Sequence, residues 1–121
     1  MATYAKFETP KELVEKAVEV VEIARNSGKL RKGMNETTKV VERGQAKLVL
    51  IAGDINPPEI VMHLPPLCDE KQIMYVFVPT KADLGAAAGL EVPTSAVAVL
   101  DIGDAKKQFK ELSDAYKQIK K

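Results

Sequence analysis

Three short apolar runs constrain the fold of this chain more than any other feature. They are KLVLIA at residues 47–52, YVFV at 75–78 and AVAVL at 96–100, and after the leading lysine none of them contains a charged residue. An apolar run without polar residues at alternate positions is typical of a strand that is buried on both faces of its sheet. Such a sheet needs helices on both sides, so the segments between the runs must supply them.

Segments with helical patterns do separate these runs. The first helix is expected to begin with Thr9-Pro10, since proline suits the first helical position, and to end at Gly28. A short strand is expected at Lys29–Lys32, and further helices at Asn35–Gly44, Pro57–Leu64, Pro65–Lys71, Lys81–Ala88 and Asp104–Lys120. This order predicts an α/β fold: a three-layer α/β/α sandwich around a mixed, mostly parallel sheet of about four strands. We expect a single domain over residues 1–121.

The composition excludes several classes of protein. Lys and Arg number 18 against 17 Asp and Glu, so a polyanion could be attracted only by a local basic patch. The only cysteine, Cys68, and the only histidine, His63, exclude a disulfide scaffold, a structural zinc site and a histidine-based triad, and we expect no metal or cofactor. The apolar runs are too short to span a membrane and the amino terminus lacks an apolar signal region. We therefore expect a soluble, cytoplasmic protein that is monomeric when free.

The segment GMNETTK at 33–39 is the candidate functional site. A helix that begins in this segment and runs on to Gly44 would have two sides. One side is polar, with Asn35, Glu36, Lys39 and Arg43, and the other would pack on the sheet, with Thr37, Val40 and Val41. Taken alone, the pattern is typical of a capped, solvated helix, because asparagine is a favoured N-cap and glutamate suits the first turn.

Basic residues around this helix start point to an anion-binding surface instead. Gly33 would let a partner's backbone come close, and the free amides of a first helical turn bind phosphate oxygens. The cations nearby in the sequence are Lys29, Arg31, Lys32, Lys39 and Arg43. A phosphate would not favour Glu36, whereas a carboxylate can accept hydrogen bonds from the amino group of a nucleobase. The segment therefore predicts a site that forms hydrogen bonds with exposed bases. Such bases occur in RNA bulges and non-Watson–Crick stems more often than in duplex DNA.

A second candidate surface is the stretch Leu90-Glu91-Val92-Pro93, which joins the helix at 81–88 to the strand at 96–100. Loops run over the protein surface, so its aliphatic groups could pack against unstacked bases. A hydrophobic turn that closes the edge of the sandwich has equal support from the pattern. Tyr75 and Phe77 could suggest a stacking platform, but helices on both faces would cover them, and we interpret them as core.

The residues from Gly33 to Val99 resemble the kink-turn RNA-binding family of the archaeal large-subunit ribosomal protein L7Ae. The resemblance rests on the combination of G-x-N-E-x-T-K, H-L-P-x-L-C, LG-x-A-x-G and EVPTSAVAV. It implies a three-layer α/β/α protein that binds kink-turns and kink-loops, which are RNA elements with tandem sheared G·A pairs and a sharply bent backbone.

The resemblance also implies roles for individual residues. Gly33, Asn35, Glu36 and Lys39 would meet the sheared guanines and nearby backbone, and Arg43 would support the phosphate side. The 90–93 loop would cover flipped nucleotides, Lys81 would face the RNA, and Asn56 and Ile60 would line a pocket for an extruded base. The expected RNA-binding residues are Lys32, Gly33, Asn35, Glu36, Lys39, Arg43, Asn56, Ile60, Lys81, Leu90, Glu91, Val92 and Pro93.

Partners follow from the same resemblance. Members of this family occur in the ribosome, on box C/D guide RNAs with fibrillarin and a Nop-type scaffold, on H/ACA guide RNAs with the pseudouridine synthase complex, and in RNase P. The chain would then be no enzyme. It would bind the bent state of the RNA preferentially, so that partner proteins find a fixed platform.

Two other classes stay open from the residues alone. A small α/β enzyme could use Asp54, which follows the 47–52 strand at the end where open sheets place ligand sites, with Glu36 or Glu91 as a second acid. The chain has no G-x-G-x-x-G or Walker motif, however, and a turn or cap role for Asp54 is the simpler interpretation. A pure protein-interaction module would have no affinity for folded RNA.

Overall fold

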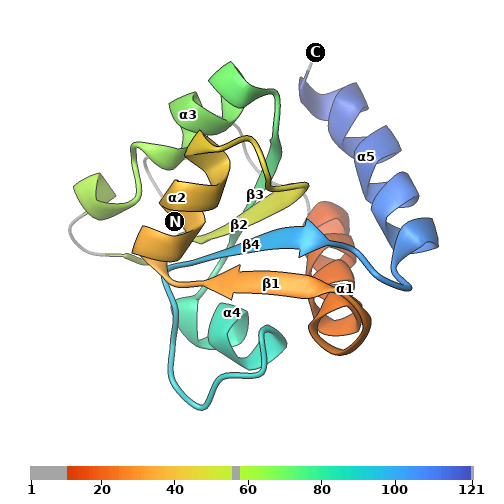
Figure 1. The fold of residues 1–121 in the computed structure, drawn as a ribbon, viewed down its shortest axis with the longest axis horizontal. Helices are drawn as coiled ribbons and strands as arrows, with labels where there is room; N and C mark the ends of the chain where they lie inside the picture. Colours follow the sequence, from red (N-terminus) through yellow and green to blue (C-terminus); the bar gives the residue numbers. More distant parts are fainter. Residues whose placement is uncertain (1–10, 56–57, 121) are drawn as a thin grey trace.

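The computed structural model describes residues 11–55 and 58–120, and a four-stranded sheet with helices on both faces forms its centre (Figure 1). The helices are α1 (Lys11–Ser27), α2 (Met34–Glu42), α3 (Leu64–Lys71), α4 (Lys81–Ala87) and α5 (Lys106–Lys120), with a 3₁₀ turn, η1, at Pro58–Ile60. The strands are β1 (Lys29–Lys32), β2 (Leu48–Ala52), β3 (Met74–Val78) and β4 (Ala96–Asp101). The three-layer sandwich predicted from the sequence is confirmed.

The sheet is mixed, but the expectation that it is mostly parallel is wrong. The strand order is β1-β4-β2-β3; β2 and β3 pair in parallel, whereas β4 is antiparallel to both of its neighbours. β1, β2 and β3 therefore point the same way and β4 is reversed. The reason lies in the connection through α4. Thr94 N donates to Lys81 O (3.2 Å), so the chain returns to the start of α4, close to the end of β3, before β4 begins.

The two faces of the sheet pack separate halves of the core. On β2, Leu48, Leu50 and Ala52 pack in the half that holds α1, α4 and α5, and Val49 and Ile51 pack in the half that holds α2 and α3. All five β2 residues are buried, which explains why this run has no polar positions. Burial on both faces is the property from which the sandwich was predicted.

The predictions for the Tyr75 and Phe77 rings, for the helices near Pro57 and Pro65 and for membrane spans can each be compared with the structure. The rings of Tyr75 and Phe77 lie in the α2/α3 half of the core, with centroids 6.2 Å apart, so their assignment to the core is confirmed. The helix predicted over Pro57–Leu64 is wrong for its described part, residues 58–64, where the structure has the three-residue turn η1; Pro57 lies outside the described residues. Helix α3 begins at Leu64, just before Pro65. Among residues 11–55 and 58–120, no helix is long and apolar enough to cross a membrane.

Candidate functional site at the start of α2

The start of α2 is fixed by a glycine in a left-handed conformation. Gly33 is the N-cap residue, with φ 94° and ψ 160°. A φ of this sign is strained for residues that carry a Cβ. A Cβ at Gly33 would meet nothing within 4 Å, so glycine is needed for the backbone angle and not for lack of space. Gly33 N donates to Ala96 O (2.8 Å), which ties the helix start to the first residue of β4.

The cap interpretation of Asn35 is wrong, because no side chain caps α2. Helix α2 begins at Met34, which puts Asn35 and Glu36 at its second and third positions, and both side chains are exposed. The first intrahelical bond runs from Thr37 N to Gly33 O (3.0 Å). The amides of the preceding turn therefore lie outside the helical ladder and give the tip a partial positive charge. The side chains of Asn35 and Glu36 lie at this tip and are exposed to solvent.

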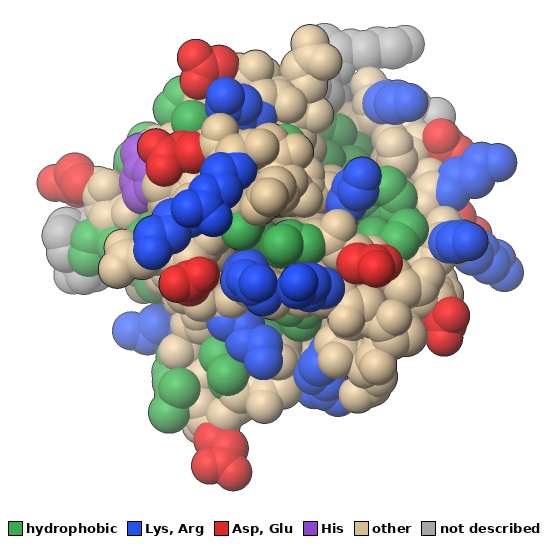
Figure 2. Space-filling view, in the orientation of Figure 1, with side chains coloured by type: hydrophobic (Ala, Val, Ile, Leu, Met, Phe, Trp, Pro, Cys, Tyr) green, Lys and Arg blue, Asp and Glu red, His purple; other side chains and the backbone are tan. Residues whose placement is uncertain are grey.

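The rest of α2 divides as predicted. Thr37, Val40 and Val41 are buried against the sheet, whereas Lys39 and Arg43 are exposed. Figure 2 shows Lys and Arg side chains gathered over α2 and β1, with acidic side chains between them. The ends of β1, Lys29 and Lys32, are exposed, and Arg31 between them is half-buried. The acid at the helix tip therefore stands in a basic surround.

A hydrogen-bonded brace, which sequence reasoning missed, holds α2 against α3. Thr38 Oγ1 donates to Met34 O at 2.8 Å, one turn back. The same oxygen lies 2.8 Å from His63 Nε2, at the N-cap of α3. The direction of this second hydrogen bond depends on the tautomer of the imidazole ring. The residues are 25 positions apart, so no local pattern announces the contact.

The loop from Leu90 to Pro93 packs directly on α4. Leu90 N donates to Gly85 O (2.9 Å), and a Cβ at Gly85 would lie 2.3 Å from Val92 O. Only a glycine in α4 allows this approach. Leu90 is half-buried, whereas Glu91, Val92 and Pro93 are exposed, with Val92 63% exposed. The loop leads within a few residues to Ala96, the residue that bonds Gly33, so the end of the loop and the tip of α2 meet at the end of the sheet where β4 begins (Figure 1).

Asp54 has a structural role at the same end of the sheet. Its Oδ1 accepts a hydrogen bond from Lys81 N (2.8 Å), the first residue of α4. Thr80 Oγ1 accepts from Asp83 N (3.1 Å) and completes the cap of this helix. The sequence placed Asp54 in a turn or cap before Pro57; it does lie in a turn, but its carboxylate bonds the start of α4, 27 residues further along the chain. This contact favours a structural role for Asp54 over that of a catalytic acid.

Four of the residues predicted for the site lie away from the tip of α2 or outside the described residues. Lys81 and Ile60 are exposed, and Ile60 is 46% exposed, an unusual state for isoleucine. Asn56 lies outside the described residues. Arg43 is the C-cap of α2, at the opposite end of the helix from Asn35 and about 12 Å away along the axis. Arg43 thus belongs to the flank of the surface and the tip residues to its centre.

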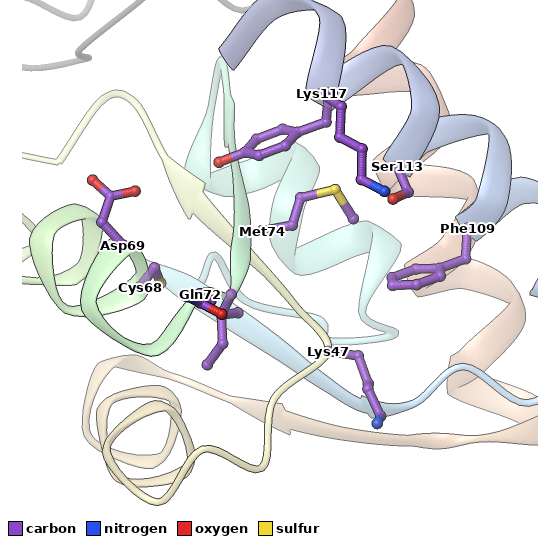
Figure 3. A pocket seen from close by; sticks show the side chains of 10 residues that line it. Lys47, Cys68, Asp69, Gln72, Met74, Phe109, Ser113 and Lys117 are labelled. Atoms are coloured by element: carbon purple, nitrogen blue, oxygen red, sulfur yellow. The ribbon is translucent and has the colours of Figure 1, made fainter. Parts of the chain in front are cut away.

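A cavity of about 370 Å³ lies away from this surface, between α3 and α5 (Figure 3). Cys68 and Asp69 of α3 line one side of it, and Ser113 and Lys117 of α5 line the other. No residue predicted for the site lines this cavity.

Comparisons with known proteins agree with this architecture. The sequence profile of the ribosomal protein L7Ae/L30e/S12e/Gadd45 family matches residues 15–109. A solved structure described as the Giardia lamblia 15.5kD RNA binding protein is 31% identical and superposes with a TM-score of 0.83. The match covers 99% of this chain and 98% of that chain, so the likeness extends over both molecules.

Proposed function

The chain belongs to the ribosomal protein L7Ae/L30e/S12e/Gadd45 family, and from this premise and the geometry at the start of α2 we propose that it is a non-catalytic reader of kink-turn and kink-loop RNA. The Giardia lamblia protein, which is similar to this chain over nearly its whole length, is described as RNA-binding, and this supports RNA as the ligand class. The observation that carries the proposal is the uncapped tip of α2, where Asn35 and Glu36 project into solvent from a basic surface.

The chemistry of the tip favours bases over phosphates as its central target. Glu36 can accept hydrogen bonds from the amino group of a guanine, and Asn35 and Lys39 can address further base acceptors and donors. In a sheared G·A pair, the edge of the guanine that forms hydrogen bonds in a Watson–Crick pair stays free to contact a protein. The free amides of the first turn, with Lys32 and Arg43 on the flanks, bind the neighbouring phosphates. Gly33 leaves open space where the RNA backbone comes closest.

The loop from Leu90 to Pro93 supplies the apolar part of the surface. Its exposed Val92 and Pro93 cover the nucleotides that are flipped out of the bend. Ile60, exposed in η1, contacts an extruded base, and Lys81 adds a cation at the start of α4. Asn56, which lies outside the described residues, is proposed from the sequence alone as a further contact to that base. Unstacked bases gain by packing on such aliphatic groups, because they lose exposure to water.

The biological setting of the proposal is assembly of ribonucleoproteins. The chain stabilises the bent state of kink-turns in ribosomal RNA, in box C/D and H/ACA guide RNAs and in RNase P RNA. The bent RNA then serves as a platform for a Nop-type scaffold with fibrillarin, or for the pseudouridine synthase complex. The chain itself is monomeric when free, acts in the cytoplasm and carries out no reaction.

One titration tests this proposal. A kink-turn RNA with donor and acceptor dyes on its two stems is mixed with the protein at physiological salt, and energy transfer reports the bend. The control RNA has Watson–Crick pairs in place of the sheared G·A pairs. The proposal predicts tight binding with increased transfer for the first RNA and little of either for the second. Equal affinity for the two RNAs would show that the tip does not read the sheared pairs.

A further inference from the structure

A groove lies on the other side of the sheet from α2, between α1 and α4, with a volume of about 690 Å³. Its floor is aliphatic. Val14 and Val18 line it from α1, and Ala86 and Ala87 line it from α4. Val14 and Val18 are only half-buried and Ala86 is exposed, so the floor is open to solvent. An aliphatic floor of this kind gains free energy when a partner covers it.

Within the described part of the chain, every ionisable side chain that lines the groove is acidic: Glu15, Glu19 and Glu22 from α1 and Asp83 from α4. The three glutamates follow one another at i, i+4 and i+7, so they share one face of the helix. Like charges at this spacing destabilise an isolated helix, so the arrangement does not serve the stability of α1. The rim is therefore a concentrated negative surface beside an apolar floor.

Among the described residues, Lys16 lies close enough to Glu19 to interact with its charge, but its hydrogen bond goes elsewhere. Lys16 Nζ bonds Glu111 of α5 at 3.0 Å, on the side of α1 that faces away from α4. Arg25 Nη1 donates to the backbone oxygen of Ala86 at 3.5 Å. Arg25 itself does not line the groove, and the carboxylates along the groove are exposed.

We propose that this groove binds a basic amphipathic segment of a partner protein. Lysine or arginine side chains of the segment lie along Glu15, Glu19 and Asp83, and its aliphatic side chains cover the floor at Val18 and Ala86. The carboxylates repel RNA phosphates, so a nucleic acid is a poor occupant. The groove and the tip of α2 lie on opposite sides of the sheet, so the partner and an RNA bind at the same time.

Fluorescence anisotropy of a labelled peptide tests the inference with the full chain. The probe has leucines at i, i+3, i+4 and i+7 and lysines on its other face, and a scrambled peptide of the same composition is its control. We expect saturable binding of the amphipathic peptide and much weaker binding of the scrambled one. Glu15→Gln with Glu19→Gln should weaken binding roughly tenfold, the combined effect of losing two exposed ion pairs.

A matched variant controls for net charge. Glu12→Gln with Glu70→Gln removes the same charge from exposed residues that do not line the groove, and should leave peptide affinity unchanged. Ala86→Phe fills the floor without any change of charge and should abolish binding. Equal binding of both peptides, or equal effects of the two charge variants, would overturn the inference.

Two other occupants are outcomes of the same experiment. Dimerisation in sedimentation equilibrium that Glu15→Gln with Glu19→Gln abolishes would assign the groove to a second copy of the chain and overturn the proposal. Competition between the peptide and kink-turn RNA would do so as well, because it would join the groove to the RNA surface. Failure of the unaltered chain to bind kink-turn RNA would refute the proposed function and leave the peptide result standing.

Discussion

Replacing Gly85 with alanine tests whether the position of the Leu90–Pro93 loop depends on its contact with α4. A Cβ at Gly85 would lie 2.3 Å from Val92 O and 3.1 Å from Pro93 Cα. Both neighbours are backbone atoms, so no side chain can rotate to make room. To restore ordinary contact distances the loop must move by about 1 Å away from α4.

Two opposing effects set the size of the change. Forcing an extra carbon into a packed contact costs about 1–3 kcal/mol, whereas alanine in place of glycine in a helix regains about 0.5–1 kcal/mol. Gly85→Ala should therefore lower the free energy of unfolding by about 1–2 kcal/mol, measured by urea denaturation. If the loop covers flipped nucleotides, its displacement should also weaken kink-turn binding roughly tenfold.

Gly44→Ala separates loop displacement from lost stability. Gly44 has φ 69°, but a Cβ there would meet nothing within 4 Å. Alanine at this position should cost about 1–2 kcal/mol through its backbone angle and leave the loop in place. Its affinity for kink-turn RNA should then match that of the unaltered chain. Equal RNA affinities for the two variants, or an unchanged stability of Gly85→Ala, would refute the reasoning.

Three further predictions follow. Glu36→Ala and Lys39→Ala should each weaken kink-turn binding by about 1–3 kcal/mol, the size of a good base contact, whereas Glu42→Ala on the same helix should not; titration calorimetry at one salt concentration compares them. The affinity should depend weakly on salt because few phosphates are neutralised, and a log–log slope equivalent to about ten released counterions would contradict this. The hydrogen bond between Lys16 and Glu111 raises the lysine pKa and lowers the glutamate pKa. The glutamate's contribution to stability is present above its ordinary pKa and is lost as the pH falls through the lowered value, and the lysine's is lost as the pH rises through its raised pKa. The urea midpoints of the unaltered chain and Glu111→Gln should thus converge in acid, and a difference that grows in acid would exclude this ion pair as the cause.

The layers of the fold could be predicted because they follow from local patterns. A strand buried on both faces has to be apolar at every position, and β2 shows this property in five consecutive residues. The direction of β4 could not be predicted in this way. It depends on the bond from Thr94 N to Lys81 O, which turns the chain back beside the end of β3, and no periodicity in the sequence records that bond.

In the candidate site, too, the features that follow from local spacing could be predicted, and those that depend on backbone angles or distant contacts could not. Helical spacing places Asn35, Glu36 and Lys39 on one exposed side of α2, and the structure has them there. Residue preference favours Asn35 as the N-cap, but it cannot reveal the backbone angle of Gly33, the residue that occupies the position. Gly85 was missed although a glycine inside a helix is a recognisable signal of close packing. The contact between Thr38 and His63 had no signal, since it joins distant parts of the chain.

The most direct measurement is the structure of the chain bound to a kink-turn RNA at a resolution that shows side-chain hydrogen bonds. We expect a Glu36 carboxylate oxygen within about 3 Å of an amino nitrogen of a sheared guanine, and the Asn35 side-chain amide in a hydrogen bond to a neighbouring base atom. RNA seated elsewhere, with both side chains still in solvent, would contradict the central claim.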